Sequence, residues 1–363
     1  MKKYITLGEV CFKASSSIAQ KNLQGIDGDY PIYGASGFIK NIDFYQQDKP
    51  YIAIVKDGAG IGRTMFLPAY SSVIGTMQYI IPKDSMDIGF LYYAICFMNL
   101  GKYYSGATIP HIYFKDYQKE LIPVFTRDKQ ESIVKILRSI DTLINHNNAQ
   151  LLDFDLLVKS RFIEMFGNPV TDSKNLGFKP LRGFIKNIRY GTSTPPVFSD
   201  YGFSFIRATN IKNGKVDNKD MKYIGQEEAN KIPKCKLFGG EMIIVRSGVN
   251  AGDTCIIDAD NIGNYAGYDI IIVFNESVNP VYINELINTH YMDMVVKPLT
   301  RRAAQPHLNS EQVQNLPIVN APIELQNQFA DFVAQVDKSK LAVQQNLNEL
   351  ETLKKSLMQQ YFG

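Results

Sequence analysis

The sequence predicts an α+β protein in which two similar strand-rich domains are joined by two long helices with approximate two-fold symmetry. Three observations indicate this fold. The second half of the chain repeats the first, two long segments lack helix breakers, and short β-branched runs are interrupted by glycines. We expect a first domain at 1–125, a long helix at 126–170, a second domain at 171–320 and a second long helix at 321–363.

The internal repeat has an offset of 196 residues. Shifted by that amount, residues 130–167 fall on residues 326–363 with eight identities in 38 positions. Two further stretches match in the same order. Pro110-His111-Ile112 falls on Pro306-His307-Leu308, again at 196, and residues 54–64 fall on residues 244–254 at an offset of 190. A period this long excludes a solenoid and indicates a duplicated domain.

The two long segments have apolar residues spaced by sevens, as in helices that pair. The inward positions expected in the first helix are Ile133, Ile140, Asn147, Phe154 and Arg161, together with Ile136, Leu143, Gln150 and Leu157. Those expected in the second are Phe329, Val336, Val343, Leu350 and Leu357, together with Phe332, Ser339, Asn346, Leu353 and Gln360. The pattern favours a paired coiled coil, with two separate helices, each packed on its own domain, as the alternative.

Within each domain, β-branched runs predict strands and longer apolar patterns predict helices. We expect strands at 51–55, 73–81, 242–246 and 270–274, and helices at 88–100 and 281–295. Glycines 58, 62, 248 and 252 are expected to form tight turns after the strands, where a positive φ is needed.

Composition excludes several protein classes. With 45% hydrophobic and 21% charged residues among 363, the chain can build real cores and is not largely disordered. Its longest apolar stretch, residues 88–100, is shorter than the ~20 residues that a membrane span requires. No secretory signal opens the chain, and the four cysteines are scattered, so we expect a reduced cytoplasmic compartment and neither a disulfide scaffold nor a zinc site.

The net charge of +3 conceals a polarity within the second domain. Residues 174–246 contain 14 basic and 6 acidic side chains, whereas residues 247–300 contain 1 and 7. A basic stretch of this kind suits a polyanion, and a solvated surface is the simpler alternative.

No catalytic constellation is apparent. The four histidines form no metal-binding motif, and the glycine-rich stretch 58–64 lacks the spacing and the lysine of a phosphate-binding loop. Motifs for a methyl donor or for amino-group methylation are also missing. We therefore expect no catalytic residue, no metal and no cofactor.

Several repeated motifs resemble those of the specificity subunit of Type I restriction–modification systems. Residues 121–123 (LIP) are followed by Gln130, and residues 316–318 (LPI) by Gln326. Asp141 and Asp337 follow further along, and Phe166-Gly167 matches Phe362-Gly363. The chain departs from the family's usual Glu-Gln at the helix starts, because Lys129 and Leu325 precede the two glutamines.

The resemblance covers essentially the whole chain and implies a non-catalytic DNA-binding subunit. Each domain would be a target recognition domain that reads one half of a bipartite, asymmetric sequence in double-stranded DNA. The helices would form an antiparallel coiled coil that spaces the domains and docks two modification subunits, which supply catalysis. Restriction subunits would complete the nuclease.

The candidate DNA contacts are side chains of the types that read base edges or bind phosphates. They are Lys56, Arg63, Lys102, Tyr103, Tyr104 and His111 in the first domain, and Arg207, Thr209, Asn210, Arg246, Asn250, Arg301, Arg302, Gln305 and His307 in the second. Candidate partner contacts on the helices are Gln130, Asp141, Gln326 and Asp337. For each of these residues a purely structural role, such as flanking a strand, ordering a loop or capping a helix, is the alternative.

Two other functions compete with a specificity subunit. One is a structural scaffold with two protein-binding lobes, and the other is a stand-alone DNA-modifying enzyme. The missing catalytic motifs argue against the enzyme.

Overall fold

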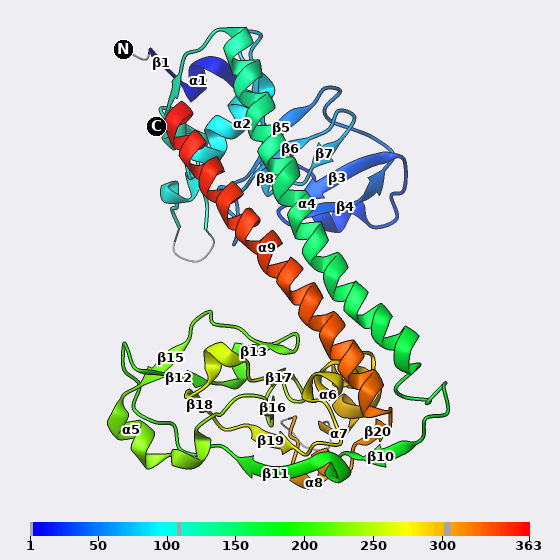
Figure 1. The fold of residues 1–363 in the computed structure, drawn as a ribbon. Coiled ribbons are helices and arrows are strands. Elements are labelled where there is room, and N and C mark those ends of the chain that lie inside the picture. Colours follow the sequence, from blue (N-terminus) through cyan, green and yellow to red (C-terminus); the bar gives the residue numbers. More distant parts are fainter. Residues whose placement is uncertain (1–2, 107–109, 301–305) are drawn as a thin grey trace. The chain divides into compact units, whose positions relative to one another are not determined.

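The computed structural model describes residues 3–106, 110–300 and 306–363, and it divides into two compact units (Figure 1). Unit 1 comprises Met1–Ala149 with Gln344–Gly363, and unit 2 comprises Gln150–Val343. Two 40-residue helices, α4 (Arg127–Phe166) and α9 (Ile323–Phe362), contribute one stretch each to both units. No helix among the described residues is long and apolar enough to cross a membrane.

Unit 1 contains a four-stranded antiparallel sheet in the order β2-β8-β5-β6, a three-stranded sheet in the order β4-β3-β7, and the pair β1-β9. The strands are β1 (Tyr4–Thr6), β2 (Cys11–Ser15), β3 (Tyr30–Gly34), β4 (Gly37–Ile42), β5 (Tyr51–Val55), β6 (Thr64–Leu67), β7 (Ser72–Val73), β8 (Met77–Pro82) and β9 (Leu121–Pro123). Its other helical segments are α1 (Leu7–Val10), η1 (Gln20–Leu23), α2 (Ile88–Phe97), η2 (Leu100–Tyr103) and α3 (Phe114–Tyr117).

Unit 2 repeats this plan with the sheets β11-β19-β16-β17 and β15-β12-β18 and the pair β10-β20, and it adds the hairpin β13-β14. The strands are β10 (Phe178–Pro180), β11 (Ile185–Tyr190), β12 (Phe203–Ile206), β13 (Ile211–Lys212), β14 (Lys215–Val216), β15 (Lys222–Ile224), β16 (Met242–Ile244), β17 (Thr254–Ile256), β18 (Tyr265–Ala266), β19 (Ile270–Phe274) and β20 (Pro317–Val319). The helical segments are η3 (Leu181–Phe184), η4 (Ala208–Asn210), α5 (Gln226–Lys231), η5 (Pro233–Cys235), η6 (Ala259–Asn261), α6 (Pro280–Ile287), η7 (Met292–Val296), α7 (Lys297–Thr300) and α8 (Ser310–Gln314).

The two units share one topology. In both four-stranded sheets the strand that precedes the glycine turn, β5 or β16, pairs antiparallel with its neighbours on both sides. In both three-stranded sheets one pair, β3·β7 or β12·β18, is parallel. This correspondence matches the duplication that the sequence predicts.

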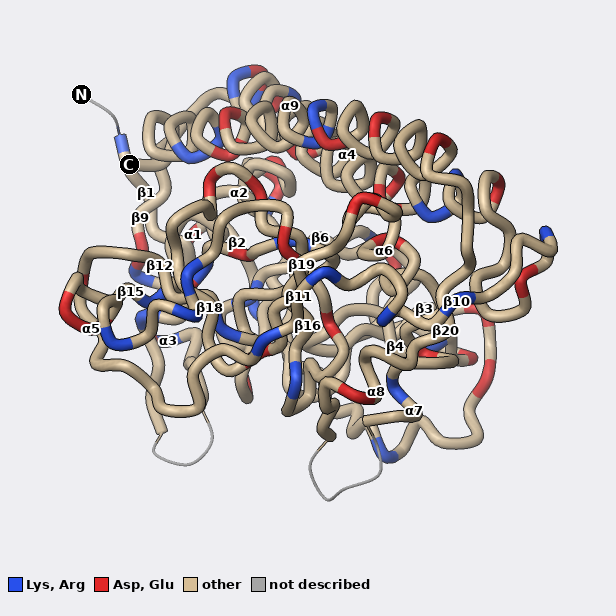
Figure 2. The backbone as a smooth tube through the Cα atoms, turned by 60° about the horizontal axis from the view of Figure 1, so that its bottom comes forward, with Lys and Arg blue, Asp and Glu red and all other residues tan. Residues whose placement is uncertain are grey.

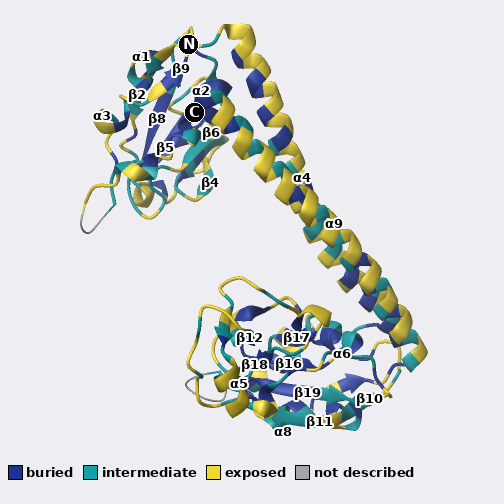
Figure 3. Cartoon of the chain, turned by 60° about the vertical axis from the view of Figure 1, so that its left-hand side comes forward, coloured by how far each residue is buried: buried dark blue, intermediate teal, exposed yellow. Residues whose placement is uncertain are grey.

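The central strands form because their residues are β-branched or aromatic and are buried along their whole length. Every residue of β5 and of β16 is buried, as Figure 3 shows by colour. The following helices begin at side-chain caps. Asp87 accepts a hydrogen bond from the Phe90 N–H at 2.9 Å at the start of α2, and Asn279 accepts one from the Val281 N–H at 3.0 Å at the start of α6.

Each domain core includes residues from both long helices. In unit 1, Ile133 and Leu137 of α4 and Phe362 of α9 join the cluster around Ile52 and Phe90. The Phe90 and Phe362 rings lie 5.1 Å apart.

Unit 2 uses the opposite ends of the same two helices. Phe162 and Phe166 of α4 and Phe329 of α9 join the cluster around Ile244 and Tyr282. The ring of Phe162 lies 5.6 Å from that of Tyr282 and 5.5 Å from that of Phe329.

The predicted inward positions of the helices are half correct. Ile133, Ile140 and Asn147 are buried as expected, but Ile136 and Leu143 are 40% and 48% exposed. The second inward row of α4 lies one residue later, at Leu137, Ile144, Leu151 and Val158, and that of α9 lies at Val333, Lys340, Leu347 and Lys354. From Ile133, the next inward residues lie four and then three positions further on, at Leu137 and Ile140, whereas the prediction placed them three and then four positions further on. The sequence could not choose between them, because α4 has leucines or isoleucines in both rows and packs on a domain as well as on α9.

Two other predicted elements are interrupted. The expected strand at 73–81 is two strands, β7 and β8, separated by a turn in which Met77 N–H donates to the Ile74 carbonyl. The expected helix at 281–295 ends at Ile287, and a π-helical segment follows it. Asn288 ends α6 because its side-chain amide donates to the Thr254 hydroxyl and to a carbonyl of the last turn.

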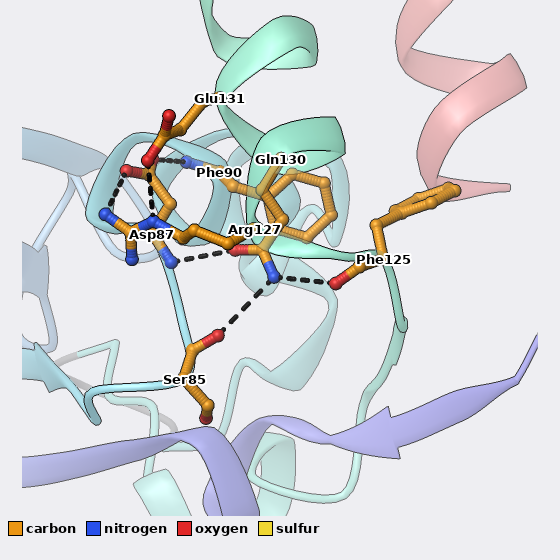
Figure 4. A network of polar contacts seen from close by, with 7 residues as sticks. All are labelled: Ser85, Asp87, Phe90, Phe125, Arg127, Gln130 and Glu131. Atoms are coloured by element: carbon orange, nitrogen blue, oxygen red, sulfur yellow. Dashed lines mark hydrogen bonds and ion pairs between the residues drawn. The ribbon is translucent and has the colours of Figure 1, made fainter.

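Gln130, in the first turn of α4, is buried, with 3% of its surface exposed (Figure 4). Its Oε1 accepts from the Asp87 N–H at 2.8 Å, and its Nε2 donates to the Phe125 carbonyl at 3.0 Å. The side chain thus ties the start of α4 to the start of α2.

Gln326 makes the same bonds in unit 2, with the Asn279 N–H and the Ala321 carbonyl, both at 2.8 Å, and it is fully buried. The prediction that Gln130 and Gln326 contact a partner subunit is therefore wrong. Their recurrence reflects a buried helix anchor that was duplicated with the domain.

Replacing Gln130 with Met keeps the volume but leaves the partly buried Asp87 N–H and Phe125 carbonyl without their partner. We expect unit 1 to lose about 2–4 kcal/mol of unfolding free energy. Urea unfolding followed by circular dichroism measures the loss. The exposed neighbour provides the control Lys129→Met, which should change stability by less than about 0.5 kcal/mol. An equal loss in the two variants would contradict the anchoring role.

Candidate nucleic-acid interface

A glycine-containing loop follows the central strand of each domain and docks on a later segment. In unit 1 this is loop 56–63, in which Gly58 has φ +91° and donates its N–H to the Pro110 carbonyl at 2.9 Å. Ile112 N–H donates to the Lys56 carbonyl at 3.0 Å. A Cβ on Gly62, whose φ is +81°, would lie 2.6 Å from the Gly101 nitrogen, so only glycine fits.

Unit 2 builds the same arrangement with loop 246–253. Gly248, with φ +88°, donates to the Pro306 carbonyl at 3.2 Å, and Leu308 N–H donates to the Arg246 carbonyl at 2.8 Å. Gly252 N–H closes the loop on the Val245 carbonyl at 2.9 Å, as Gly62 does on Val55. We call loops 56–63 and 246–253 the docked loops. They bring the two matching motifs of the repeat together, and the predicted turn glycines are confirmed.

The docked loop of unit 1 gathers three of the predicted residues. Lys56 Nζ lies 3.8 Å from an oxygen of Asp57, and His111 Nδ1 contacts the other oxygen of that carboxylate. Arg63 is exposed, and its Nη1 donates to the Ala35 carbonyl at 2.7 Å. Asp57 was not among the predicted residues, although its place between Lys56 and Gly58 was a signal for an ion pair.

The other candidates of unit 1 lie in and after η2. Lys102 pairs with Glu120, and the Tyr103 hydroxyl donates to the same carboxylate. Burial opposes ionisation of Glu120, but these two bonds prevail and lower its pKa. The hydrogen bond to Glu120, together with burial, raises the pKa of Tyr103 to about 12. Tyr104 is 54% exposed, so it is the aromatic ring of this group that can reach a ligand.

In unit 2, η4 carries two predicted residues, Thr209 and Asn210, and a third, Arg207, precedes it. Thr209 is exposed. Asn210 is 1% exposed, and its amide bonds the Arg207 side chain and the carbonyls of Asp217 and Lys219. The prediction that Asn210 contacts DNA is therefore wrong, because this side chain holds the loop together.

Arg207 is also largely occupied, since its Nη2 donates to the Asp220 carbonyl at 2.6 Å and its Nε to Asn210 Oδ1 at 3.3 Å. The docked loop holds Arg246 and Asn250, and Asn250 Nδ2 lies 3.4 Å from the Ala208 carbonyl. His307 is paired with Ser247 in a β-bridge. The predicted Arg301, Arg302 and Gln305 lie outside the described residues.

Arg246 is held by groups that the sequence did not single out. Its guanidinium carbon lies 4.6 Å from the ring centroids of both Tyr190 and Tyr268. Its backbone N–H donates to Asp269 Oδ1 at 3.0 Å. Tyr268 and Asp269 precede β19 and Tyr190 ends β11, so sheet pairing brings these residues to one place, and no local motif could have shown it.

The tip of the unit 2 docked loop presents an apolar side chain. Val249 is 97% exposed, and Gly248 and Asn250 flank it. Its counterpart in the repeat is the exposed Ala59. The exposed tips carry only methyl groups, which suits contact with apolar parts of a ligand such as a thymine methyl.

The two aspartates predicted to contact a partner are partly buried and paired. Asp141 accepts from the Tyr93 hydroxyl at 2.7 Å and pairs with Lys354. Asp337 pairs with Lys215 of β14. Figure 2 shows acidic and basic residues interspersed along both long helices.

The described residues offer no evident catalytic group. No three of their His, Cys, Asp or Glu side chains gather as metal ligands would. Burial raises the pKa of the Cys11 and Cys255 thiols to about 12, the reverse of what a nucleophilic thiolate requires.

The buried carboxyl of Asp269 should make the stability of the chain depend on pH. Burial raises the pKa of its carboxyl from 3.8 to about 6, although the bond from Arg246 N–H and the Arg246 charge lower it. The folded state therefore binds this proton more tightly than the unfolded state does. The free energy of unfolding is highest below about pH 4, and it falls by at most about 3 kcal/mol as the pH rises through about 6.

Asp269→Asn keeps the acceptor for Arg246 N–H and removes the charge. We expect the stability of the variant relative to the natural chain to rise between pH 4 and pH 7. Urea unfolding across that range measures it, with the exposed Asp260→Asn as the matched control. Parallel pH profiles for the natural chain and Asp269→Asn would refute the assignment.

Comparison with known proteins identifies relatives. A family model described as the type I restriction modification DNA specificity domain matches residues 2–153 and 187–352. The type I restriction enzyme MjaVIII specificity subunit of Methanocaldococcus jannaschii is 22% identical over 333 residues, which cover 85% of this chain and 77% of that protein.

Solved structures share the fold. The S subunit of a type I restriction-modification system from M. genitalium aligns with a TM-score of 0.65 at 14% identity, over 100% of this chain and 96% of that one. A chain from a structure on complex assembly and conformational transition of the type I restriction-modification system aligns with a TM-score of 0.55 at 15% identity, over 99% and 97%.

Proposed function

The chain belongs to the type I restriction modification DNA specificity domain family, and from this premise we propose that it reads a bipartite, asymmetric DNA target for a Type I restriction–modification complex. Each domain contacts one half-site. The observation that carries the proposal is the docked loop, which has the same backbone bonds in both units but different side chains. The same backbone structure with different side chains suits two related domains that read different base sequences.

The long helices act as the spacer between the half-sites. The pairs Asp141–Lys354 and Asp155–Lys340 occur in opposite order along α4 and α9, which is the order of an antiparallel coiled coil with approximate two-fold symmetry. Each pair involves a lysine of the inward row, so a slip of one heptad would separate both lysines from their carboxylates.

The same helices are the docking surface for two modification subunits, with restriction subunits added to the complete nuclease. Outward-facing apolar side chains on α4 support this role, because an isolated helix would gain nothing from exposing them. They are Ile136, Leu143, Leu152, Leu156 and Leu157, between 40% and 66% exposed. This surface replaces the buried glutamines as the proposed partner contact. The chain itself supplies recognition, and its partners supply catalysis.

The proposal is tested by mapping methylated bases in cells that carry the chain with its modification subunits. A split, asymmetric methylated motif that disappears when this chain is deleted is the expected result. Binding of the mapped duplex by the assembled complex should weaken steeply with salt, as phosphate contacts require. Methylation that persists without the chain, or affinity that salt does not change, would contradict DNA reading by this subunit.

Deleting residues 146–152 together with residues 343–349 removes one heptad from each helix and keeps both lysine–aspartate pairs. We expect the half-sites to stay the same while the gap between them shortens by about three base pairs, since seven residues span about 10 Å. Methylome sequencing measures the gap. Ala substitutions at the exposed Asn145 and Asn148 keep the length and should leave the gap unchanged. If the deletion variant keeps the same gap between the half-sites, the helices do not act as the spacer.

A further inference from the structure

Arg246 differs from the other candidate cations of the described chain in having no hydrogen bond or ion pair at its side chain, although its charge acts on the nearby Asp269 carboxylate. Among the described residues, Lys56 lies beside Asp57, Lys102 pairs with Glu120, and Arg63 and Arg207 donate to carbonyls. The Arg246 side chain contacts two tyrosine rings and has no hydrogen bond or ion pair to a described residue. Its Nε is buried without a partner among the described residues, whereas the residue as a whole is only partly buried.

The plane of this guanidinium is nevertheless fixed. The rings of Tyr190 and Tyr268 both hold it at 4.6 Å, and the Tyr190 hydroxyl is itself fixed, since it accepts from the Ser310 N–H at 2.9 Å. The backbone of Arg246 is fixed on both sides, by Asp269 at its N–H and by Leu308 at its carbonyl. The arginine is therefore a preorganised fork of N–H donors at the base of the docked loop.

We propose that Arg246 reads a guanine in the major groove of the half-site bound by unit 2, donating both terminal N–H groups to N7 and O6. This inference rests on the proposed function. A fork of fixed orientation matches two acceptors in one plane, which guanine presents, whereas a phosphate can be met by a mobile point charge.

The counterpart in the repeat supports the contrast. Lys56 occupies the equivalent position of loop 56–63, where it lies beside a carboxylate and contacts no aromatic ring of the described residues. An ammonium group is a point charge on a flexible stem and lacks the planar fork that fixes the geometry of such a contact. Of the two docked loops, unit 2 therefore carries the guanine-reading arginine, and unit 1 contributes a positive charge at the same place.

The test uses the full chain assembled with its modification subunits and the target found by methylome mapping. Each guanine of both half-sites is replaced in turn by 7-deazaguanine, which lacks the N7 acceptor. For the natural chain, we expect the dissociation constant to rise at least about fivefold at one guanine of one half-site. Inosine at that position keeps N7 and O6 and should bind within about twofold of guanine.

In Arg246→Lys, which keeps the charge between the rings, the same 7-deazaguanine substitution should cost less than about twofold. Tyr268→Ala should also reduce the discrimination, because it frees the guanidinium, whereas Tyr268→Phe should retain it. The control Arg182→Ala removes another arginine of unit 2 and should leave the pattern unchanged. Circular dichroism melting checks that each variant is folded.

Three results would overturn the inference. They are a target with no guanine in either half-site, equal 7-deazaguanine effects in the natural chain and Arg246→Lys at every position, or a uniform loss of affinity for all duplexes in Arg246→Lys. The last result would assign Arg246 to a phosphate. Failure of the proposed function is distinct, since the natural complex would then bind its mapped duplex no better than a scrambled one.

Discussion

Each domain of this chain completes its hydrophobic core with both long helices, and the rest of the structure depends on that shared core. Phe362, at the end of the chain, packs on Phe90 of unit 1, and Phe329 packs on Phe162 and Phe166 of unit 2. Neither domain can bury its apolar surface with the helix that follows it in sequence alone. Residues of α4 and α9 therefore meet inside each domain core, and these cores help to decide which rows of the two helices are buried.

The buried glutamines link the long helices to the docked loops, where recognition is proposed. Gln130 and Gln326 join the first turn of a long helix to the residue that caps the domain helix α2 or α6. These helices belong to the same cores as the strands that lead into the docked loops. A rigid frame thus connects the spacer to the surface where recognition is proposed, and a rigid frame is what a fixed arrangement of base-reading side chains requires.

The two docked loops have the same backbone conformation, but their side chains differ. Gly58 and Gly248, as well as Gly62 and Gly252, keep positive φ values, because the loop cannot close otherwise. Arg246 lies between tyrosines where Lys56 lies beside an aspartate. In this way one fold can present two chemistries at corresponding positions, which is the property an asymmetric target demands.

The sequence by itself determined the duplication, the two long helices, the central strands and the turn glycines, because these depend on local periodicity and on backbone conformation. Through the repeat, it also indicated Lys56, Arg246, His111 and His307 as candidate DNA contacts. Only the tertiary structure decided which rows of α4 and α9 face inward, since both rows of α4 contain leucine or isoleucine and the choice depends on what packs against them. The buried state of Gln130, Gln326 and Asn210 and the tyrosines that hold Arg246 were likewise fixed by contacts between residues far apart in the chain. No local pattern records such contacts, because the free energy that selects them comes from burial in the assembled core.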